Sequence, residues 1–148
     1  MKAVIQRVYG AELSVGGETV SKISNGMTVY FGVAKGDAET DCERYAKKIA
    51  NLRIFEDDNG KMNLSVKDIS GEILLISQFT LLANTDRGNR PDFFGAEAPD
   101  RAKVLYEYMG KCLEAEGIPV KYGVFGADMT ILQSNAGPVT IIMELPKK

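Results

Sequence analysis

The sequence predicts a mixed α/β fold, in which a curved mixed β-sheet or a two-sheet barrel-like core carries two helices packed on one side. Short β-type runs recur along most of the 148 residues, and only two segments have the apolar spacing of a helix. Two helices cannot cover both faces of so many strands, so we expect both on the same side. The length suffices for one core, and we expect a single domain over residues 1–148.

The first third of the chain is predicted to be a meander of strands. Apolar and β-branched residues mark strand structure from Val4 to Val15, and Gly16-Gly17 supplies the positive φ angles of a tight turn. The returning strand runs from Thr19 to Ile23. Asn25-Gly26 forms another turn before Met27 to Val33, whose composition suits a buried strand.

Two segments have helical periodicity. The first begins at Thr40, where Thr40 to Glu43 fits a capping box. Its apolar face consists of Cys42, Tyr45, Ala46, Ile49 and Ala50. The second begins at Pro99, which suits a first helical turn, and ends at Gly117. Its apolar stripe consists of Ala102, Leu105, Tyr106, Met109 and Leu113.

The segments between and after the helices read as strands and one long loop. Arg53 to Glu56 and Met62 to Val66 form a short hairpin, and Glu72 to Ile76 is the best candidate for a central strand. Residues 82–99 have no period, and a loop of this length is often functional. The closing strands are predicted at Pro119–Phe125, Met129–Gln133 and Val139–Leu145. An uncovered sheet edge remains, which favours a homodimer.

The composition excludes several kinds of chemistry. The chain contains no histidine, so a Ser-His-Asp triad, a Cys-His nucleophile and an imidazole zinc site are all excluded. The 18 basic and 20 acidic side chains give a net charge of −2, which argues against a protein that coats nucleic acid by charge. Cys42 and Cys112 lie far apart in the sequence and have no metal-binding spacing, a use of cysteine that is typical of a reducing compartment. We expect a cytoplasmic protein with no signal peptide, membrane span, metal or cofactor.

The first candidate site is the segment Ser77-Gln78-Phe79-Thr80-Leu81, where the apolar strand becomes polar. A strand end that feeds a long loop is a natural binding site. On a regular strand Ser77 and Phe79 point one way, and Gln78 and Thr80 point the other. The alternative is that these residues only satisfy exposed backbone at the end of the strand.

The second candidate is Asn135 to Thr140, which contains Gly137-Pro138. Gly-Pro joins the least restricted residue to the only one that readily accepts a cis peptide, so it can present carbonyl oxygens in unusual directions. The alternative is a trans turn that opens the last strand, because only about 5–6% of X-Pro bonds in folded proteins are cis.

Arginines interleaved with aromatic residues form a third candidate. Gln6-Arg7 and the loop residues Arg87, Arg90, Phe93 and Phe94 suit a nucleotide or RNA end, through phosphate pairing and base stacking. Solvated charge and loop-anchoring phenylalanines are the alternative. Residues 126–129 are a weaker signal, read by default as a turn followed by a core methionine.

Six motifs together resemble the D-aminoacyl-tRNA deacylase family across essentially the whole chain. In order they are MKAVIQRV, KMNLSV, SQFTL, RPDF, FGADM and NAGPVT. The resemblance implies hydrolysis of the ester that joins a D-amino acid, or mischarged glycine, to the terminal ribose of tRNA. It also implies a homodimer with its sites at the subunit interface, each receiving a Gly-cis-Pro element from the opposite subunit.

The resemblance also assigns roles to residues. Gly137 and Pro138 would be the chiral selector and Arg7 would hold them, with Met129 near the terminal adenosine. The pocket at the scissile ester would consist of Ser77, Gln78, Phe79 and Thr80. Ala136 departs from the polar or acidic residue expected before this glycine, so the supporting hydrogen bonds are expected to differ.

Two mechanisms and two other functions stay open. Thr80 would be a nucleophile, or the protein would only position a water and the ribose 2′-hydroxyl while backbone N–H groups near Phe79 and Thr80 stabilise the oxyanion. We favour the second mechanism, because no histidine is present to activate Thr80. The other functions are a deacylase of relaxed chirality, with a trans Gly-Pro bond, and a non-catalytic protein that binds RNA ends.

Overall fold

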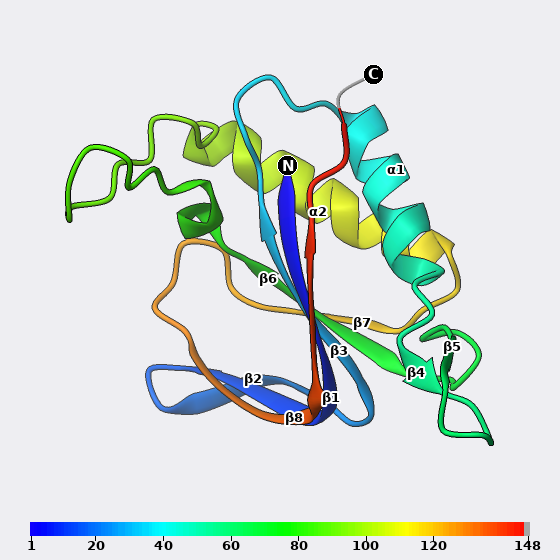
Figure 1. Cartoon of the computed structure of the whole chain (residues 1–148). Coiled ribbons are helices and arrows are strands. Elements are labelled where there is room, and N and C mark those ends of the chain that lie inside the picture. Colours follow the sequence, from blue (N-terminus) through cyan, green and yellow to red (C-terminus); the bar gives the residue numbers. More distant parts are fainter. Residues whose placement is uncertain (147–148) are drawn as a thin grey trace.

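The fold is organised around one long strand, β1. In this computed structural model, which describes residues 1–146, β1 pairs antiparallel with β3 through its first half, with β2 through its second half, and with β8 along most of its length (Figure 1). β6 runs parallel to β3 and β7 runs parallel to β6, so the sheet is mixed. Its strands are β1 (Lys2–Val15), β2 (Glu18–Ile23), β3 (Gly26–Gly32), β6 (Glu72–Ser77), β7 (Val120–Tyr122) and β8 (Thr130–Met143).

Both faces of the central strand β6 are buried. Ile73 and Leu75 belong to a core cluster shared with both helices, whereas Leu74 and Ile76 belong to a second core cluster on the opposite face. The helices α1 (Glu39–Ala50) and α2 (Pro99–Ala115) contribute to the first cluster alone. Both lie on the same side of the sheet (Figure 1). The second cluster forms where the sheet curls over itself. This confirms the predicted mixed α/β class, with a barrel-like curved sheet and two helices on one side.

Most predicted elements occur where the sequence places them. Gly16 and Gly17 have φ angles of +58° and +84° in the turn between β1 and β2. The short hairpin consists of β4 (Phe55–Glu56) and β5 (Met62–Leu64). α2 begins at Pro99 as predicted, and Gly117 follows its end with a φ of +85°. No helix among residues 1–146 is long and apolar enough to cross a membrane.

The start of the first helix differs from the prediction. α1 begins at Glu39, so Thr40 lies inside its first turn and Ala38 is the N-cap residue. The Ala38 N–H donates to Oδ2 of Asp41 at 3.0 Å. The carboxylate that reaches back to the cap is therefore that of Asp41, and the predicted capping box of Thr40 with Glu43 was wrong.

The end of the sheet also differs. The separate strands predicted at 129–133 and 139–145 are one strand, β8, rather than two strands divided by a turn. Along its ladder with β1, Thr140 faces Gln6 and Asn135 faces Val8. Residues 136–139 therefore leave the ladder opposite a single β1 residue, Arg7. We call residues 136–139 the β8 bulge.

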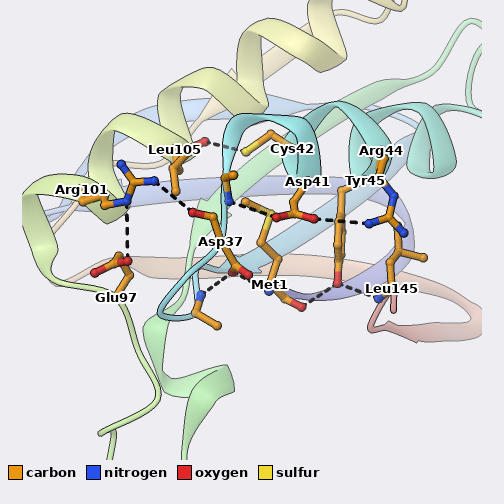
Figure 2. A network of polar contacts seen from close by, with 12 residues as sticks. Met1, Asp37, Asp41, Cys42, Arg44, Tyr45, Glu97, Arg101, Leu105 and Leu145 are labelled. Carbon is orange, nitrogen blue, oxygen red and sulfur yellow. Dashed lines mark hydrogen bonds and ion pairs between the residues drawn. The ribbon is translucent and has the colours of Figure 1, made fainter. Parts of the chain in front are cut away.

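A polar network around one buried ion pair ties the first residue and the segment after β8 to the helices (Figure 2). The Met1 α-ammonium lies 2.5 Å from Oδ2 of Asp37, and both groups are almost completely shielded from solvent. Tyr45 on α1 donates to the Met1 carbonyl oxygen at 2.6 Å and accepts from the Leu145 N–H at 2.9 Å. Arg101 on α2 donates to the Asp37 carbonyl oxygen at 3.1 Å. This network thus connects the first residue, the segment after β8 and both helices.

Both cysteines are free, and their surroundings predict low reactivity. Burial, followed by the proximity of Cys112 and acidic side chains, raises the pKa of the Cys42 thiol to about 12. Burial also raises the pKa of Cys112. Because the thiolate is the reactive form, we expect Cys42 in a Cys112→Ser variant to react with a thiol reagent at pH 8 roughly a hundredfold or more slowly in the native state than in urea. Equal rates in the two states would contradict this.

Candidate functional site

A cavity of about 840 Å³ lies beside the carboxyl ends of β3 and β6. It lies between the segment after β6, the start of α2 and the chain that leads into β8. Its walls are largely apolar and aromatic, as in most sites for small organic groups. The lining residues are Phe31, Val33, Lys35, Ile76, Ser77, Gln78, Phe79, Phe93, Ala96, Glu97, Ala98, Pro99, Ala102, Tyr106, Phe125, Gly126, Ala127, Asp128, Met129 and Ile131.

The floor of the cavity is the point where β6 ends. The Gln78 N–H donates to the Phe31 carbonyl oxygen at 2.9 Å, and residues Phe79–Leu82 then form a 3-10 turn, η1. The alternating arrangement expected for residues 77–80 was therefore wrong beyond Ser77. Gly32 permits this turn, since a Cβ there would lie 2.5 Å from Leu82 Cδ2 and 2.8 Å from the Gln78 carbonyl oxygen. The chain folds back at once and presents its polar side chains beside the cavity.

Three of the four predicted pocket residues line the cavity, and the fourth accepts a hydrogen bond from one of them. Ser77, Gln78 and Phe79 belong to the lining, whereas Thr80 lies outside it. Gln78 Nε2 donates to Thr80 Oγ1 at 2.5 Å. An amide donor orients a hydroxyl but does not remove its proton. The Thr80 hydroxyl is thus held in place by a group that is not a general base.

One wall of the cavity is an aromatic pair. Phe79 is 58% exposed, and its ring meets that of Phe93 edge to face at a centroid distance of 5.0 Å. Of the other loop candidates, Phe94 is exposed and, like Arg87 and Arg90, lies outside the lining. The aromatic part of the third sequence candidate therefore contributes one residue to the cavity. The exposed ring of Phe79, backed by the half-buried ring of Phe93, offers a surface on which a base can stack.

The opposite wall comes from the turn before β8. Gly126 has a φ of +78°, as a turn requires, and Met129 lines the cavity while packing against the second core cluster. A Cβ on Gly123 would lie 2.8 Å from Met129 Sδ, so this glycine leaves room for the methionine. Met129 is therefore a residue packed on the core, as the default interpretation predicted, and at the same time part of the cavity wall.

Sequence reasoning assigned several cavity residues to the core alone. Tyr106 is buried and donates from its hydroxyl to the Leu75 carbonyl oxygen at 2.8 Å, and burial raises its pKa. Phe125 packs at a centroid distance of 5.9 Å from that ring. Helical and strand periodicity identify such residues as apolar positions. Only the fold reveals which apolar positions border a cavity.

The β8 bulge presents an exposed dipeptide on a buried support. The Gly137–Pro138 peptide bond is cis, as the resemblance implied, and Gly137 has a φ of +120°. Ala136 is buried, and its carbonyl oxygen accepts from Arg7 Nε at 3.1 Å. Arg7 is only 8% exposed and also donates from Nη1 to the Ile54 carbonyl oxygen at 2.9 Å. Arg7 bonds to the main-chain oxygen of residue 136, so this hydrogen bond forms although alanine stands where a polar or acidic residue was expected.

The structure divides the predicted site residues into two groups. Ser77, Gln78, Phe79 and Met129 meet at the cavity. Arg7, Gly137 and Pro138 form the β8 bulge and its support, outside the lining of the chain's own cavity. Among residues 1–146, no cluster of three or more acidic, cysteine or histidine side chains is placed to hold a metal ion.

Comparison with known proteins adds to this geometry. The family model described as D-Tyr-tRNA(Tyr) deacylase matches residues 4–144. A D-aminoacyl-tRNA deacylase of Geotalea daltonii is 51% identical over 148 residues, covering 100% of this chain and 99% of the relative. A D-aminoacyl-tRNA deacylase of Aquifex aeolicus is 51% identical over 144 residues, covering 97% of each chain.

Two solved structures are also similar. The c-Myc DNA Unwinding Element Binding Protein superposes with a TM-score of 0.93 at 42% identity, covering 99% of this chain and 100% of that one. A probable eukaryotic D-amino acid tRNA deacylase superposes with a TM-score of 0.82 at 18% identity, covering 97% and 98%. At that identity, the second likeness bears on the fold alone.

Proposed function

The chain belongs to the D-aminoacyl-tRNA deacylase family, and from this premise we propose that it releases D-amino acids and mischarged glycine from tRNA while rejecting L-aminoacyl-tRNA. The enzyme is an ester hydrolase of that family. One observation carries the proposal of chirality: an exposed Gly137–Pro138 dipeptide stands on a buried support, outside the cavity of its own chain. This supports a homodimer in which each bulge enters the partner's cavity.

The residue types provide a physical account of chiral rejection. Main-chain oxygens held rigidly at the β8 bulge accept hydrogen bonds from the α-amino group of the substrate. This leaves room for a hydrogen atom or a D side chain, whereas an L side chain is directed into backbone. Rejection by such a clash explains why glycine passes.

The cavity suits the last nucleotide of tRNA. The Phe79 ring, exposed and backed by Phe93, offers a stacking surface, and Met129 supplies a soft apolar contact for the terminal adenosine. Because the net charge is −2, binding rests on this small contact rather than on a basic surface. The proposed reaction needs no cofactor, and an enzyme that acts on charged tRNA would work in the cytoplasm.

Hydrolysis, in this proposal, needs positioning rather than a protein nucleophile. The ester of an aminoacyl-tRNA is already activated, so placing a water and the ribose 2′-hydroxyl correctly supplies much of the acceleration. Backbone N–H groups near Phe79 and Thr80 stabilise the developing oxyanion. The hydrogen bond from Gln78 holds the Thr80 hydroxyl in one orientation beside these groups, but it does not remove the hydroxyl proton.

Replacement of Thr80 separates this mechanism from an acyl-enzyme. For Thr80→Ala we expect kcat on D-Tyr-tRNA to fall by about tenfold or less, because only an orienting hydroxyl is lost. Rapid-quench mass spectrometry should detect no acyl adduct on the wild type. Abolished turnover together with an acyl-Thr80 adduct would overturn the positioning mechanism, and Thr80→Ser serves as the control that keeps the hydroxyl.

Arg7 is expected to act through the bulge that it supports. A lysine cannot reproduce the two directed bonds from Nε to Ala136 and from Nη1 to Ile54. We expect Arg7→Lys to lower kcat/KM on D-Tyr-tRNA by about tenfold. Arg53→Lys is a matched control, because Arg53 is exposed and donates to two oxygens of Asn63, the carbonyl oxygen and Oδ1, in the β4–β5 hairpin region away from the bulge. Equal effects of the two substitutions would contradict a role for Arg7 at the site.

The decisive experiment compares release of D-Tyr, L-Tyr and glycine from charged tRNA by the purified protein. We expect fast release of D-Tyr and glycine and little release of L-Tyr. Equal release of D-Tyr and L-Tyr would indicate a deacylase of relaxed chirality. No release of any substrate would leave only a protein that binds RNA ends.

A further inference from the structure

A chain of side-chain hydrogen bonds lies beside the β8 bulge and has no part in the site described above. Tyr30 donates from its hydroxyl to Gln133 Oε1 at 2.9 Å, and Gln133 Nε2 donates to Gln6 Oε1 at 2.7 Å and to Asn135 Oδ1 at 2.7 Å. Gln6 Nε2 then donates to Thr140 Oγ1 at 3.2 Å. We call these five residues the amide network.

Gln133 is the centre of the amide network. A glutamine amide has one carbonyl oxygen and two N–H donors, and here the oxygen accepts from Tyr30 while the nitrogen donates to both Gln6 and Asn135. Each partner thereby fixes a different direction of the amide. The bonds to Tyr30 and Gln6 are partly buried, so the side chain of Gln133 is restrained from two strands at once.

The ends of the amide network are the two residues that bound the β8 bulge. Asn135 faces Val8 and Thr140 faces Gln6 at the last paired positions before and after residues 136–139. Arg7 and Gln6 are adjacent on β1, so their side chains leave opposite faces of the strand. Arg7 therefore holds the bulge from one face, through the Ala136 carbonyl oxygen, and the amide network holds both of its ends from the other.

The amide network also reaches the cavity wall within the same chain. Ile131 lines the cavity and lies two residues before Gln133 on β8, so both side chains lie on the same face of that strand. Tyr30 and Ile131 pack against the same core cluster, the second one. The bulge is therefore connected to β1, to β3 and to residues that pack on the second core cluster, rather than to a loop.

We infer that Gln133 is a positioning residue that sets how strictly L-aminoacyl-tRNA is rejected, by holding both ends of the β8 bulge. The inference rests on the proposed function. An L side chain is excluded only while the backbone that it meets cannot yield. A D side chain makes no such contact, and Arg7 still holds the Ala136 carbonyl oxygen when the amide network is lost. Slack at the two ends of the bulge alone therefore admits L substrates while the groups that bind D substrates stay in place.

The test is Gln133→Met, which keeps the length of the side chain and removes all three hydrogen bonds. We expect the ratio of kcat/KM for D-Tyr-tRNA to that for L-Tyr-tRNA to fall by about tenfold or more, through faster release of L-Tyr. Release of D-Tyr should change less than about threefold. Ser134→Ala, on the neighbouring exposed position of β8, should leave the ratio unchanged.

Three further variants separate positioning from a loss of folding. Gln133→Glu keeps an acceptor for Tyr30 but cannot donate to Gln6 or Asn135, so its ratio should fall as well. Tyr30→Phe removes one bond and should lower the ratio less. The double variant Gln6→Met/Gln133→Met should lower the ratio by less than the product of the effects of Gln6→Met alone and Gln133→Met alone, because both side chains belong to one network.

The outcomes distinguish this inference from the proposed function. A wild type that releases D-Tyr and L-Tyr equally would overturn both. A D-selective wild type whose ratio survives Gln133→Met, Gln133→Glu and Tyr30→Phe would overturn the role of Gln133 alone. A fall in melting temperature without a fall in the ratio, in any variant that folds, would do the same.

Discussion

Replacement of Gly137 by alanine is expected to lower kcat/KM on D-Tyr-tRNA by about a hundredfold while the protein still folds. At a φ of +120° an L residue is strained, and its Cβ would lie 3.0 Å from both Arg7 Nη2 and Val139 Cγ2. The added methyl group forces the β8 bulge into another backbone conformation, whereas loss of a support only loosens it. The carbonyl oxygens then no longer point at the α-amino group of the substrate.

Gly88→Ala is the matched control for this expectation. Gly88 has a similar φ of +115°, but a Cβ there would meet nothing within 4 Å, and the residue lies in the loop away from the cavity lining. Both variants should lose comparable backbone stability, which urea unfolding measures, but only Gly137→Ala should lose activity on charged tRNA. Full activity of Gly137→Ala would remove the bulge from the site.

Replacement of Asp37 by asparagine is expected to lower the free energy of unfolding by about 3–5 kcal/mol, because it leaves the Met1 ammonium buried without its counter-charge. In the wild type the Ala34 N–H donates to Asp37 Oδ2 at 2.7 Å. Asparagine has nearly the same shape as aspartate, and its side-chain oxygen can accept the same hydrogen bond. The effect therefore reports the charge rather than the packing. Urea unfolding at neutral pH measures it.

Asp41→Asn provides the comparison within the same network (Figure 2). Asp41 pairs with Arg44 at 3.3 Å, and both side chains are partly exposed, so this ion pair is screened by solvent. We expect its loss to cost about 1 kcal/mol or less. If the two asparagine variants were equally stable, the Met1–Asp37 pair would not be the important contact of the network.

Local patterns predicted the elements of this fold well. Gly16-Gly17 and Asn25-Gly26 predicted the turns between the first three strands. The start of each helix was predicted to within one residue. The predicted division of β8 failed because a turn signal, Gly137-Pro138, lies inside a strand. What keeps that strand continuous is its pairing with β1, more than a hundred residues away, which no local pattern reports.

The site was only partly predictable for the same reason. Ser77, Gln78 and Phe79 stood out because a buried strand turned polar at their position. Tyr106 and Phe125 gave no such signal, since a cavity wall and a core have the same composition. Gln6, Asn135 and Thr140 lay within candidate segments, but Tyr30 and Gln133 gave no signal, because the network forms only when β1, β3 and β8 align.

The β8 bulge has a consequence for the solubility of the protein. β8 spans 14 residues and, within residues 1–146, pairs only with β1, so its outer edge is open. A long regular edge is a template on which further chains add as strands. Residues 136–139 interrupt that edge near its middle, and Pro138 has no N–H to offer a neighbouring strand. The segment that we place at the centre of recognition thus also protects the sheet from uncontrolled growth into aggregates.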